Sequence, residues 1–413
     1  MELQGQHVVV VGMARSGVAA ATLALAKGAT VHCVDQNPAA PAVAGCSLHY
    51  GSDPIGSLLM KADRVVVSPG VPARHPDIAA AIAAGVRVEG ELAFAASFLS
   101  FPLLAVSGTN GKSTTTYLLG QILEQAGFRP FVGGNLGIPL SEAALHPDNY
   151  NIGAVEVSSY MMELPGGFHP HAAAILNLSP DHLERHGDLD NYGAHKCRMF
   201  AQMGPADAQI LPIHDARLLR LAEGSPGTRL YLGAWPGLRA EGNQVELVGT
   251  PDPGPIDVSE FQLPGLHNRE NLSAAILLAA WAGMKRSSLR VGALRGLAHR
   301  LERIERPGNI HWYNDSKATN VDSTRVALEA MTRPSIVLLG GRGKAGADYQ
   351  SLLPLLQDHQ VLCFGEEGPR IAAALGSPAL GSPITGSPAL CGSLAEAVAL
   401  AAQLAQPGSA VLL

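Results

Sequence analysis

A phosphate-binding pattern is the sharpest chemical feature of the chain. The stretch AVSGTNGKSTTT (105–116) follows an apolar run and precedes the helix-like TTYLLGQILEQAG. Small residues let the backbone wrap around phosphates, Lys112 and the N–H groups of the helix start supply positive potential, and the Ser113 hydroxyl suits Mg²⁺. The complete P-loop pattern would have Gly at 106, where this chain has Val. We therefore expect a partial P-loop, with a plain glycine turn as the alternative.

Two stretches place a carboxylate and a histidine just beyond strand-like runs. Glu156 lies near the end of the strand predicted in GAVEVSSYMMEL (153–164), and His182 follows the strand predicted in ILNLSPDHLERHG (175–187). Ligands bind beyond the carboxyl ends of strands in open α/β sheets, so Lys112, Glu156 and His182 should converge there. A carboxylate in that place needs a partner, which a cation at the phosphate site would provide. A water-facing acid at a strand end is the alternative for Glu156.

A basic cluster follows in NYGAHKCRMF (191–200). On composition alone, its Lys196 is expected to be a solvated charge on a helix, because long charged side chains usually keep their heads in water.

A second glycine loop, VGMARSGVA (11–19), stands near the start of the chain. Gly12 and Gly17 occupy the first and third glycine places of a dinucleotide fingerprint, but Ala14 replaces the glycine that lets the backbone approach a pyrophosphate. Asp35 ends the next strand, where a ribose-binding acid would sit. Nucleotide binding and a tight strand–helix turn both remain open, and a nicotinamide-dependent enzyme is disfavoured.

Three polar stretches in the second half of the chain could recognise small ligands. GLHNREN (265–271) places Asn268 at a helix start, where capping is the alternative role. NDSKATN (314–320) packs varied polar groups that suit a small zwitterion, or form a polar turn. GGRGKAGAD (340–348) is a glycine loop that could offer a lysine to an anion.

The elements that position these residues alternate between strand-like runs and Ala-rich helical stretches, which predicts parallel sheets covered by helices. A chain of 413 residues exceeds the size of a single core. We predict an α/β fold of three domains: a Rossmann-like domain over 1–92, a central P-loop ATPase-type domain with a mainly parallel sheet over 93–297, and a Rossmann-like domain over 298–413. The final PGSAVLL resembles a buried strand with nothing to cover it, so we expect a missing C-terminal segment.

Composition excludes several classes of protein. The chain is 47% hydrophobic and 15% charged, and its net charge of −6 gives no sign of a nucleic-acid surface. The five cysteines are scattered without a CxxC pair, which suits a reducing cytosol. Neither a secretory signal nor an apolar run of about 18 residues is present, so we expect a cytoplasmic protein without a membrane partner.

Taken together, the motifs resemble the Mur ligase family closely and cover nearly the whole chain. They occur in the family's order: GTNGKST, GGNLG, EVSSY, NLSPDHLERHG, AHKCRMF, GLHNRENLSAA, GLAHRLE and NDSKATN. The first glycine loop, HRLE and DSKATN resemble most the branch that adds D-glutamate. The resemblance implies a monomeric enzyme of peptidoglycan synthesis that joins D-glutamate to UDP-N-acetylmuramoyl-L-alanine. The substrate carboxylate would take the γ-phosphate of ATP to form an acyl phosphate, which the amine then attacks.

The resemblance also implies residue roles. The catalytic residues would be Lys112, Glu156, His182 and Lys196. ATP would be bound by Gly108, Thr109, Asn110, Gly111, Lys112, Ser113, Thr114, Asn268, Arg300 and Asp315. The two substrates would contact Ser16, Asp35, Ser68, Pro69, Asn135, His182, Lys317, Thr319 and Lys344. Two Mg²⁺ ions would be held by Ser113, Glu156, His182 and Lys196, the lysine as a CO₂-derived carbamate.

Departures and alternatives accompany the resemblance. Family members continue beyond VLL with a serine and an aromatic residue that help bind D-glutamate, and this chain has Tyr160 and Met161 where Phe-Gln is common. A Mur ligase that adds a diamino acid, a folylpolyglutamate synthetase and a P-loop nucleotide-binding protein without ligase activity are the alternatives. Because the ATP groups and the amino-acid groups lie in different domains, we expect the third domain to swing in about a linker at 297–300.

Overall fold

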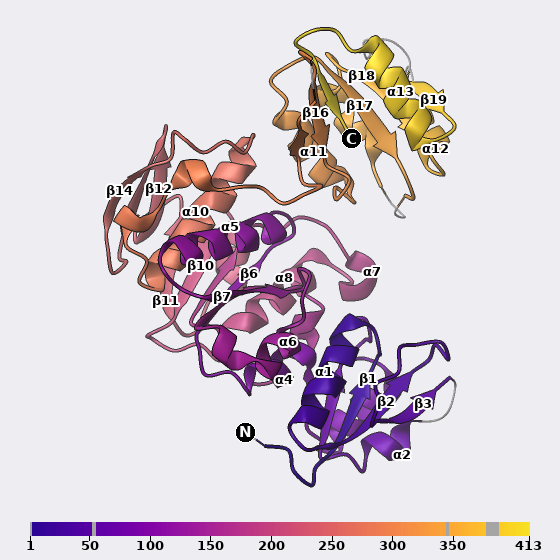
Figure 1. The fold of residues 1–413 in the computed structure, drawn as a ribbon, viewed down its shortest axis with the longest axis vertical. Coiled ribbons are helices and arrows are strands. Elements are labelled where there is room, and N and C mark those ends of the chain that lie inside the picture. Colours follow the sequence, from indigo (N-terminus) through magenta and orange to yellow (C-terminus); the bar gives the residue numbers. More distant parts are fainter. Residues whose placement is uncertain (1, 52–54, 307, 344–346, 377–387) are drawn as a thin grey trace. The chain divides into compact units, whose positions relative to one another are not determined.

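The computed structural model describes residues 2–51, 55–306, 308–343, 347–376 and 388–413. Its strands form three sheets of five, nine and six strands, in chain order along the sequence (Figure 1). The described residues separate into two compact units. One contains residues 1–261 and 271–294, and the other contains residues 262–270 and 295–413.

The N-terminal sheet has the order β3-β2-β1-β4-β5, and all of its pairs are parallel. Its strands are β1 (His7–Val11), β2 (Thr30–Asp35), β3 (Ser47–Tyr50), β4 (Arg64–Val67) and β5 (Val88–Gly90). The helices are α1 (Arg15–Ala26), α2 (Gly56–Leu59), α3 (Pro76–Ala83) and α4 (Glu91–Ala96). Alternate valines of β1 enter two different cores, because successive strand side chains point to opposite faces: Val8 and Val10 join one, Val9 and Val11 the other. This parallel sheet is the arrangement that the alternation of strand-like and helical runs predicted.

The central sheet has the order β14-β13-β12-β11-β10-β9-β6-β8-β7. Its strands are β6 (Leu103–Ser107), β7 (Pro130–Gly134), β8 (Ile152–Glu156), β9 (Ala172–Ile175), β10 (Ala208–Pro212), β11 (Thr228–Leu232), β12 (Gly237–Glu241), β13 (Gln244–Val248) and β14 (Gly254–Asp257). Pairing is parallel from β7 to β12 and antiparallel for β12–β13 and β13–β14. The prediction of a mainly parallel sheet is confirmed.

Helices surround the central sheet and connect its strands. They are α5 (Lys112–Gln125), α6 (Leu140–Leu145), α7 (Leu183–His186), α8 (Leu189–Cys197), α9 (Ala216–Leu221) and α10 (Leu266–Trp281), and a short 3₁₀ helix, η2, spans Met161–Glu163. The helices α1 and α4 of the N-terminal domain pack on α6 of the central domain. Their apolar side chains share one core, which therefore joins these two domains into a single compact unit.

The C-terminal sheet has the order β15-β16-β20-β17-β18-β19. Its strands are β15 (Glu302–Ile304), β16 (His311–Asn314), β17 (Ser335–Gly340), β18 (Gln360–Phe364), β19 (Ala389–Cys391) and β20 (Ala410–Leu412), and its helices are α11 (Val321–Glu329), α12 (Gly368–Leu375) and α13 (Leu394–Leu404). Only β15 pairs antiparallel among the strand pairs of this described sheet. The strand β20 lies between β16 and β17 and is buried throughout, as its apolar sequence predicted.

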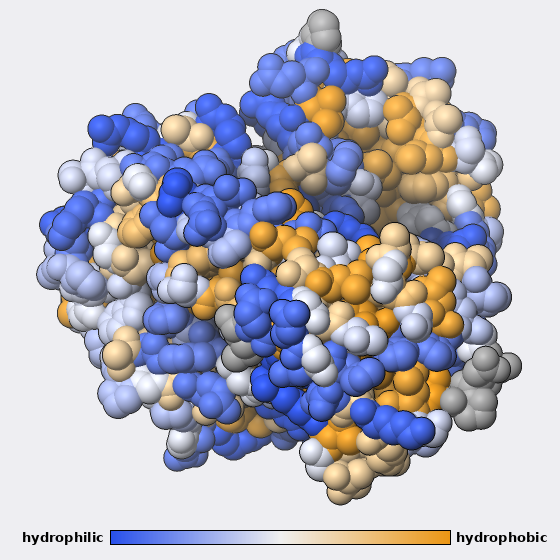
Figure 2. Space-filling view, turned by 60° about the horizontal axis from the view of Figure 1, so that its bottom comes forward, coloured by the Kyte–Doolittle hydropathy of each residue, from blue (hydrophilic) through white to orange (hydrophobic). Residues whose placement is uncertain are grey.

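Three observations concern membrane-spanning helices, the surface and the cysteines. Within the described ranges, no helix combines the length and the apolar character needed to cross a membrane. Figure 2 shows hydrophilic side chains interspersed with apolar patches over the face that it displays. All five cysteines are free, and four of them are buried.

Candidate active site

The loop between β6 and α5 has the form that the phosphate-binding pattern predicts. Gly108 and Gly111 have φ angles of +148° and +82°, and Gly111 caps α5 in the left-handed region that glycine tolerates. A Cβ atom on Gly111 would lie 2.2 Å from Oδ1 of Asn271, the residue that also accepts the Thr115 hydroxyl at 3.2 Å. A side chain at this position would therefore disturb both the turn and the contact of the loop with α10.

Two lysines meet at one carbonyl of this loop. Lys112 donates from Nζ to the Gly108 carbonyl oxygen at 3.0 Å and to the Thr109 carbonyl oxygen at 2.6 Å. Lys196 donates from Nζ to the same Gly108 oxygen at 2.7 Å. The loop thus gathers two amines at the carboxyl end of β6, where a phosphate site was predicted.

Lys196 is not the solvated helix charge that its composition favoured. Its side chain is 1% exposed, and Nζ lies 4.2 Å from the centroid of the Tyr192 ring. Burial, reinforced by the positive charge of Lys112, holds the pKa of Lys196 well below its usual range. The expectation from composition is therefore wrong, since the helix α8 turns this residue towards the loop and away from water.

Glu156 lies at the end of β8 and is buried, with 2% of its surface exposed. Its Oε1 accepts a hydrogen bond from Nδ2 of Asn135 at 2.6 Å. Its Oε2 is buried and has no hydrogen-bond partner among the described residues. The alternative of a water-facing acid is wrong, and a carboxylate oxygen left in this state is the kind of group that a cation satisfies.

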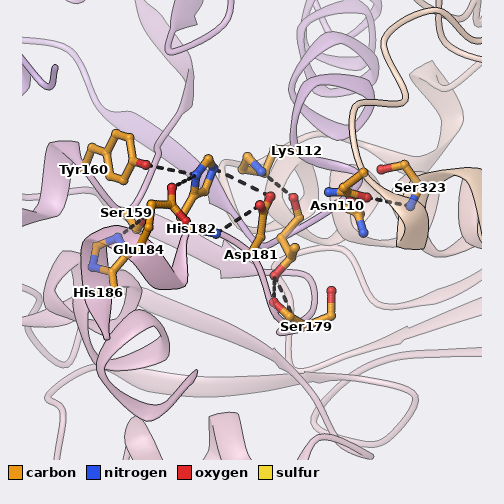
Figure 3. Close-up of polar contacts among 12 residues, drawn as sticks. Asn110, Lys112, Ser159, Tyr160, Ser179, Asp181, His182, Glu184, His186 and Ser323 are labelled. Carbon is orange, nitrogen blue, oxygen red and sulfur yellow. Dashed lines mark hydrogen bonds and ion pairs between the residues drawn. The ribbon is translucent and has the colours of Figure 1, made fainter. Parts of the chain in front are cut away.

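His182 precedes α7 with a φ of +55°. Its Nδ1 lies 2.9 Å from the Tyr160 hydroxyl, and its main-chain N–H donates to Oδ1 of Asp181 at 3.0 Å (Figure 3). Nε2 lies 3.6 Å from Oδ2 of the same carboxylate. The histidine is therefore oriented by a phenol on one side and by an acid on the other. From the sequence, Tyr160 was noted only as a departure from the family pattern, without a role.

Asn177 was missed by the sequence analysis and braces the phosphate loop. Its Oδ1 accepts the main-chain N–H groups of Thr109 at 3.1 Å and of Asn110 at 2.9 Å. The Thr109 hydroxyl also exchanges hydrogen bonds with the main chain of Ser179. The signal was the Asn that follows the strand in NLSPDH, but the sequence did not reveal which loop it would reach.

A metal can be accommodated by part of the predicted ligand set. The described residues contain no cluster of three or more His, Cys, Asp and Glu side chains suited to a metal ion. Glu156 contributes a partnerless carboxylate oxygen and Ser113, at the first turn of α5, a hydroxyl. Lys196 as an ammonium group would repel a cation, so it fits the set only in another chemical form.

The N-terminal glycine loop borders a cavity of about 570 Å³. The cavity is lined by Val11, Gly12, Val34, Asp35, Gln36, Gly51, Ile55, Gly70, Val71, Pro72, His75 and Asp77. Asp35 is thus placed at the predicted pocket, although its two oxygens already accept the main-chain N–H groups of Met13 and Asn37. Ser68 braces the loop through a 2.6 Å hydrogen bond from Oγ to the Gly12 carbonyl oxygen.

The other two predicted residues of this domain, Ser16 and Pro69, are not among the residues that line this cavity. Ser16 is half-buried in the first turn of α1. Pro69 lines a small crevice together with Ser68, Tyr160 and Glu163, among others. The loop after β4 therefore runs between the cavity of the N-terminal domain and the central domain.

In the C-terminal unit, Asp315 ties the linker to the end of β16. Its Oδ1 accepts the Leu301 N–H at 2.9 Å, and burial raises the pKa of Asp315 to about 6 against the opposing charge of Arg300. Lys317 and Thr319 are exposed just beyond the same strand. Asn268 lies in this unit too, and its Nδ2 donates to the Pro264 carbonyl oxygen at 2.7 Å. Lys344 lies outside the described residues.

Comparison with known proteins matches models for all three parts of the chain. Residues 6–90 match the Mur ligase MurD-like N-terminal domain, residues 106–279 the Mur ligase middle domain, and residues 299–413 the Mur ligase glutamate ligase domain. UDP-N-acetylmuramoylalanine–D-glutamate ligases from Anaeromyxobacter dehalogenans and Myxococcus xanthus are 41% and 39% identical. Their alignments cover 100% of this chain and 93% and 94% of theirs.

Solved structures share the fold at low identity. UDP-N-acetylmuramate–alanine ligase MurC from Thermotoga maritima superposes with a TM-score of 0.58 at 19% identity, covering 98% of this chain and 95% of that one. MurF ligase from the same organism, solved in complex with ADP, gives 0.61 at 14% identity, covering 100% and 91%. With full-length relatives at 41% identity and three matching domain models, the chain belongs to the Mur ligase family of ATP-dependent, amide-forming ligases, in its MurD-like branch.

Proposed function

We propose that this chain joins D-glutamate to UDP-N-acetylmuramoyl-L-alanine, with ATP converted to ADP and phosphate. The observation that carries the proposal is the partnerless oxygen of Glu156 at the end of β8. It lies at the same edge of the sheet as the amines of Lys112 and Lys196, which both donate to the Gly108 carbonyl oxygen. The full-length likeness to D-glutamate ligases supports the choice of substrates. Both substrates are small molecules, and the proposed enzyme acts as a monomer without nucleic acid or membrane.

The proposal assigns one task to each domain, with boundaries at 1–92, 93–297 and 298–413. The cavity beside Asp35 and the loop at Ser68 and Pro69 would hold the uridine nucleotide, and Ser16 would contact its phosphates from the α1 start. Residues 108–114, with Asn268, Arg300 and Asp315, would hold ATP. Lys317, Thr319 and Lys344 would receive D-glutamate. The third domain would close on the second about the linker at 297–300.

Phosphoryl transfer requires charge neutralisation and in-line positioning more than covalent catalysis by the protein. Lys112 already sits among the loop carbonyls, and would exchange those hydrogen bonds for the β- and γ-phosphate oxygens. Asn135 and His182 would orient the L-alanyl carboxylate for attack on the γ-phosphorus. The acyl phosphate that forms is then attacked by the amine of D-glutamate, and phosphate leaves from the tetrahedral intermediate.

The proposed Mg²⁺ ligands are Ser113 and Glu156 for one ion and His182 with Lys196 for the other. When bound, Mg²⁺ neutralises phosphate charge in this class of reaction. For Lys196 we propose a carbamate: the neutral amine adds to CO₂, a C–N bond forms, and one proton is released to water. Burial supports this step, because it favours the neutral amine that the addition needs and leaves an anion in place of a cation.

The test is phosphate release by the full-length protein with ATP, Mg²⁺ and UDP-N-acetylmuramoyl-L-alanine, compared among D-glutamate, meso-diaminopimelate, L-lysine and L-alanine. We expect release only with D-glutamate. Lys112→Ala should lower it by on the order of a hundredfold or more. Release that depends on a diamino acid would favour a different Mur ligase. Release without any amino acid would favour a P-loop ATPase, and no D-glutamate-dependent release would refute the proposal.

A further inference from the structure

A largely buried ion pair lies between the N-terminal cavity and His182. Glu163, at the end of η2, and Arg185, in α7, form a two-pronged pair: Nε to Oε1 at 2.5 Å and Nη2 to Oε2 at 3.0 Å. The two side chains are only 12% and 11% exposed, for the arginine and the glutamate. Such a fork fixes direction as well as distance, because both bonds lie in one plane.

On one side, the pair holds the loop that lines the cavity. Oε2 of Glu163 also accepts the main-chain N–H of Ala73 at 3.0 Å. The guanidinium of Arg185 lies 3.5 Å from the carbonyl oxygens of Pro69 and Gly70. Gly70 lines the cavity itself, together with the next two residues of the loop. Both members of the pair therefore touch the same short segment of the N-terminal domain.

On the other side, the pair holds the residues around His182. The guanidinium carbon of Arg185 lies 4.8 Å from the centroid of the Tyr160 ring, whose hydroxyl meets Nδ1 of His182 at 2.9 Å. Arg198 adds a hydrogen bond to the Glu163 carbonyl oxygen at 3.1 Å. Burial alone would raise the pKa of Glu163, but the bonds from Arg185 and Ala73 hold it below its usual value, so the pair stays charged at neutral pH.

We propose that Glu163 and Arg185 are positioning residues that fix Tyr160 and His182 relative to the cavity of the N-terminal domain. Neither is among the residues assigned to ATP, metal or substrate, and both act through others. A substrate with a nucleotide at one end and a reacting carboxylate at the other needs this distance to be constant. The pair thus sets how well binding of the nucleotide end aligns the carboxylate, an inference whose kinetic part rests on the proposed function.

The kinetic test uses Arg185→Ala, Arg185→Lys and Glu163→Gln in the full-length enzyme. We expect kcat/KM for the nucleotide-linked substrate to fall about a hundredfold in Arg185→Ala, with the KM for ATP changed less than about twofold. Arg185→Lys should recover part of the loss, since it restores the charge without the fork. A rise in the KM for ATP as large as the fall in kcat/KM for the nucleotide-linked substrate would overturn the inference.

The control is Glu89→Gln, which breaks another buried pair of the same unit. Glu89 binds Arg64, and the two side chains are 3% and 2% exposed. Neither residue lines the cavity or contacts Tyr160. This variant should lose as much thermal stability as Glu163→Gln while keeping kcat/KM. If it loses kcat/KM equally, the effect of Glu163 is one of stability, and the inference fails.

A second readout does not need activity. Hydrogen exchange is followed in peptides covering 68–73 and 159–187, with and without UDP. In the unaltered protein UDP should slow exchange in both segments, and in Arg185→Ala only in the first. Protection of both segments in the variant, or of neither in the unaltered protein, would overturn the inference. A protein that passes this test but releases no phosphate with D-glutamate would instead contradict the proposed function.

Discussion

The glycine loops after β1 and β6 share one local design and differ in their surroundings. Each follows a buried strand and precedes a helix, β1–α1 in one case and β6–α5 in the other. In the first loop, the polar groups that reach the turn from other strands bond to its main chain: Ser68 donates to the Gly12 oxygen and Asp35 accepts the Met13 N–H. In the second, two lysines share the Gly108 oxygen, and a carboxylate nearby on β8 keeps an oxygen without a partner.

The difference shows that glycines alone do not supply a strand–helix loop with the charged groups needed for chemistry. A tight strand–helix turn needs only glycine and a few bracing bonds, which both loops have. Charged groups arrive from other segments, here α8 for Lys196 and β8 for Glu156, because the carboxyl ends of parallel strands meet at one edge. The first loop borders a cavity, whereas the second carries the groups proposed for catalysis.

The largest expected effect comes from removing the Lys196 side chain, which contacts the second loop. Lys196→Ala should lower D-glutamate-dependent phosphate release by on the order of a thousandfold, because the anion proposed to help hold the second Mg²⁺ is lost. If that anion is a carbamate, short carboxylates or bicarbonate should restore part of the rate. The measurement is phosphate release with and without added acetate.

Lys61→Ala provides the control for this lysine. Lys61 is exposed in the N-terminal domain and lines neither the cavity nor the phosphate loop. Its variant should keep the full rate. Full activity of Lys196→Ala would return Lys196 to a purely structural role, and loss without any rescue would argue against the carbamate.

A second prediction compares the glycines of the two loops. In Gly17→Ala the new Cβ would lie 1.8 Å from the Gly12 carbonyl oxygen, so the free energy of unfolding should fall by about 3 kcal/mol. The KM for the nucleotide-linked substrate should rise, and that for ATP should not. Gly111→Ala should give the reverse pattern in KM, because its φ of +82° and its contact with Asn271 belong to the ATP loop.

The control is Gly167→Ala, where an added Cβ has no neighbour within 4 Å. Denaturant unfolding and KM values for both substrates decide the outcome. A shift in the KM for ATP in Gly17→Ala would mean that the two loops are not independent.

The sequence predicted the parts of each loop that depend on spacing. Glycines after a strand, Lys112 at the helix start and Glu156 at the end of β8 all follow from local pattern and from the edge rule for parallel sheets. The alternation of strand-like and helical runs predicted parallel sheets covered by helices, but it did not predict how many strands each sheet contains. The burial of β20 also followed from its apolar run.

What the sequence could not predict are contacts made across long separations. Asn177 binds the main chain near Asn110, and Arg185 reaches Glu163 and the loop at Pro69, although neither belongs to a spacing pattern. Lys196 was misjudged from composition for the same reason, since its burial depends on how α8 packs. Only the family resemblance pointed to it.

The smallest expected effect is a dependence of the free energy of unfolding on pH. The carboxylate of Asp35 braces the first loop. His186, at the end of α7, is 7% exposed, and its Nε2 lies 3.0 Å from the Ser159 hydroxyl oxygen. Burial, followed by the charge of His195, lowers the pKa of His186 to about 4 from an unfolded value of 6.5. Its folded form is therefore neutral, and its contribution to stability is complete above pH 6.5 and is lost as the pH falls towards 4.

At pH 5.5 the loss due to His186 should be about 1 kcal/mol. His186→Gln, which keeps a polar atom for Ser159, should lose less stability than the unaltered protein between pH 7 and pH 5.5. Chemical unfolding at the two pH values measures the difference, with the exposed His214→Gln as the control expected to behave like the unaltered protein. Equal losses of stability in His186→Gln and the unaltered protein would show that the group responsible for the acid sensitivity is not His186. The expected difference in pH dependence between the two regions would then be wrong.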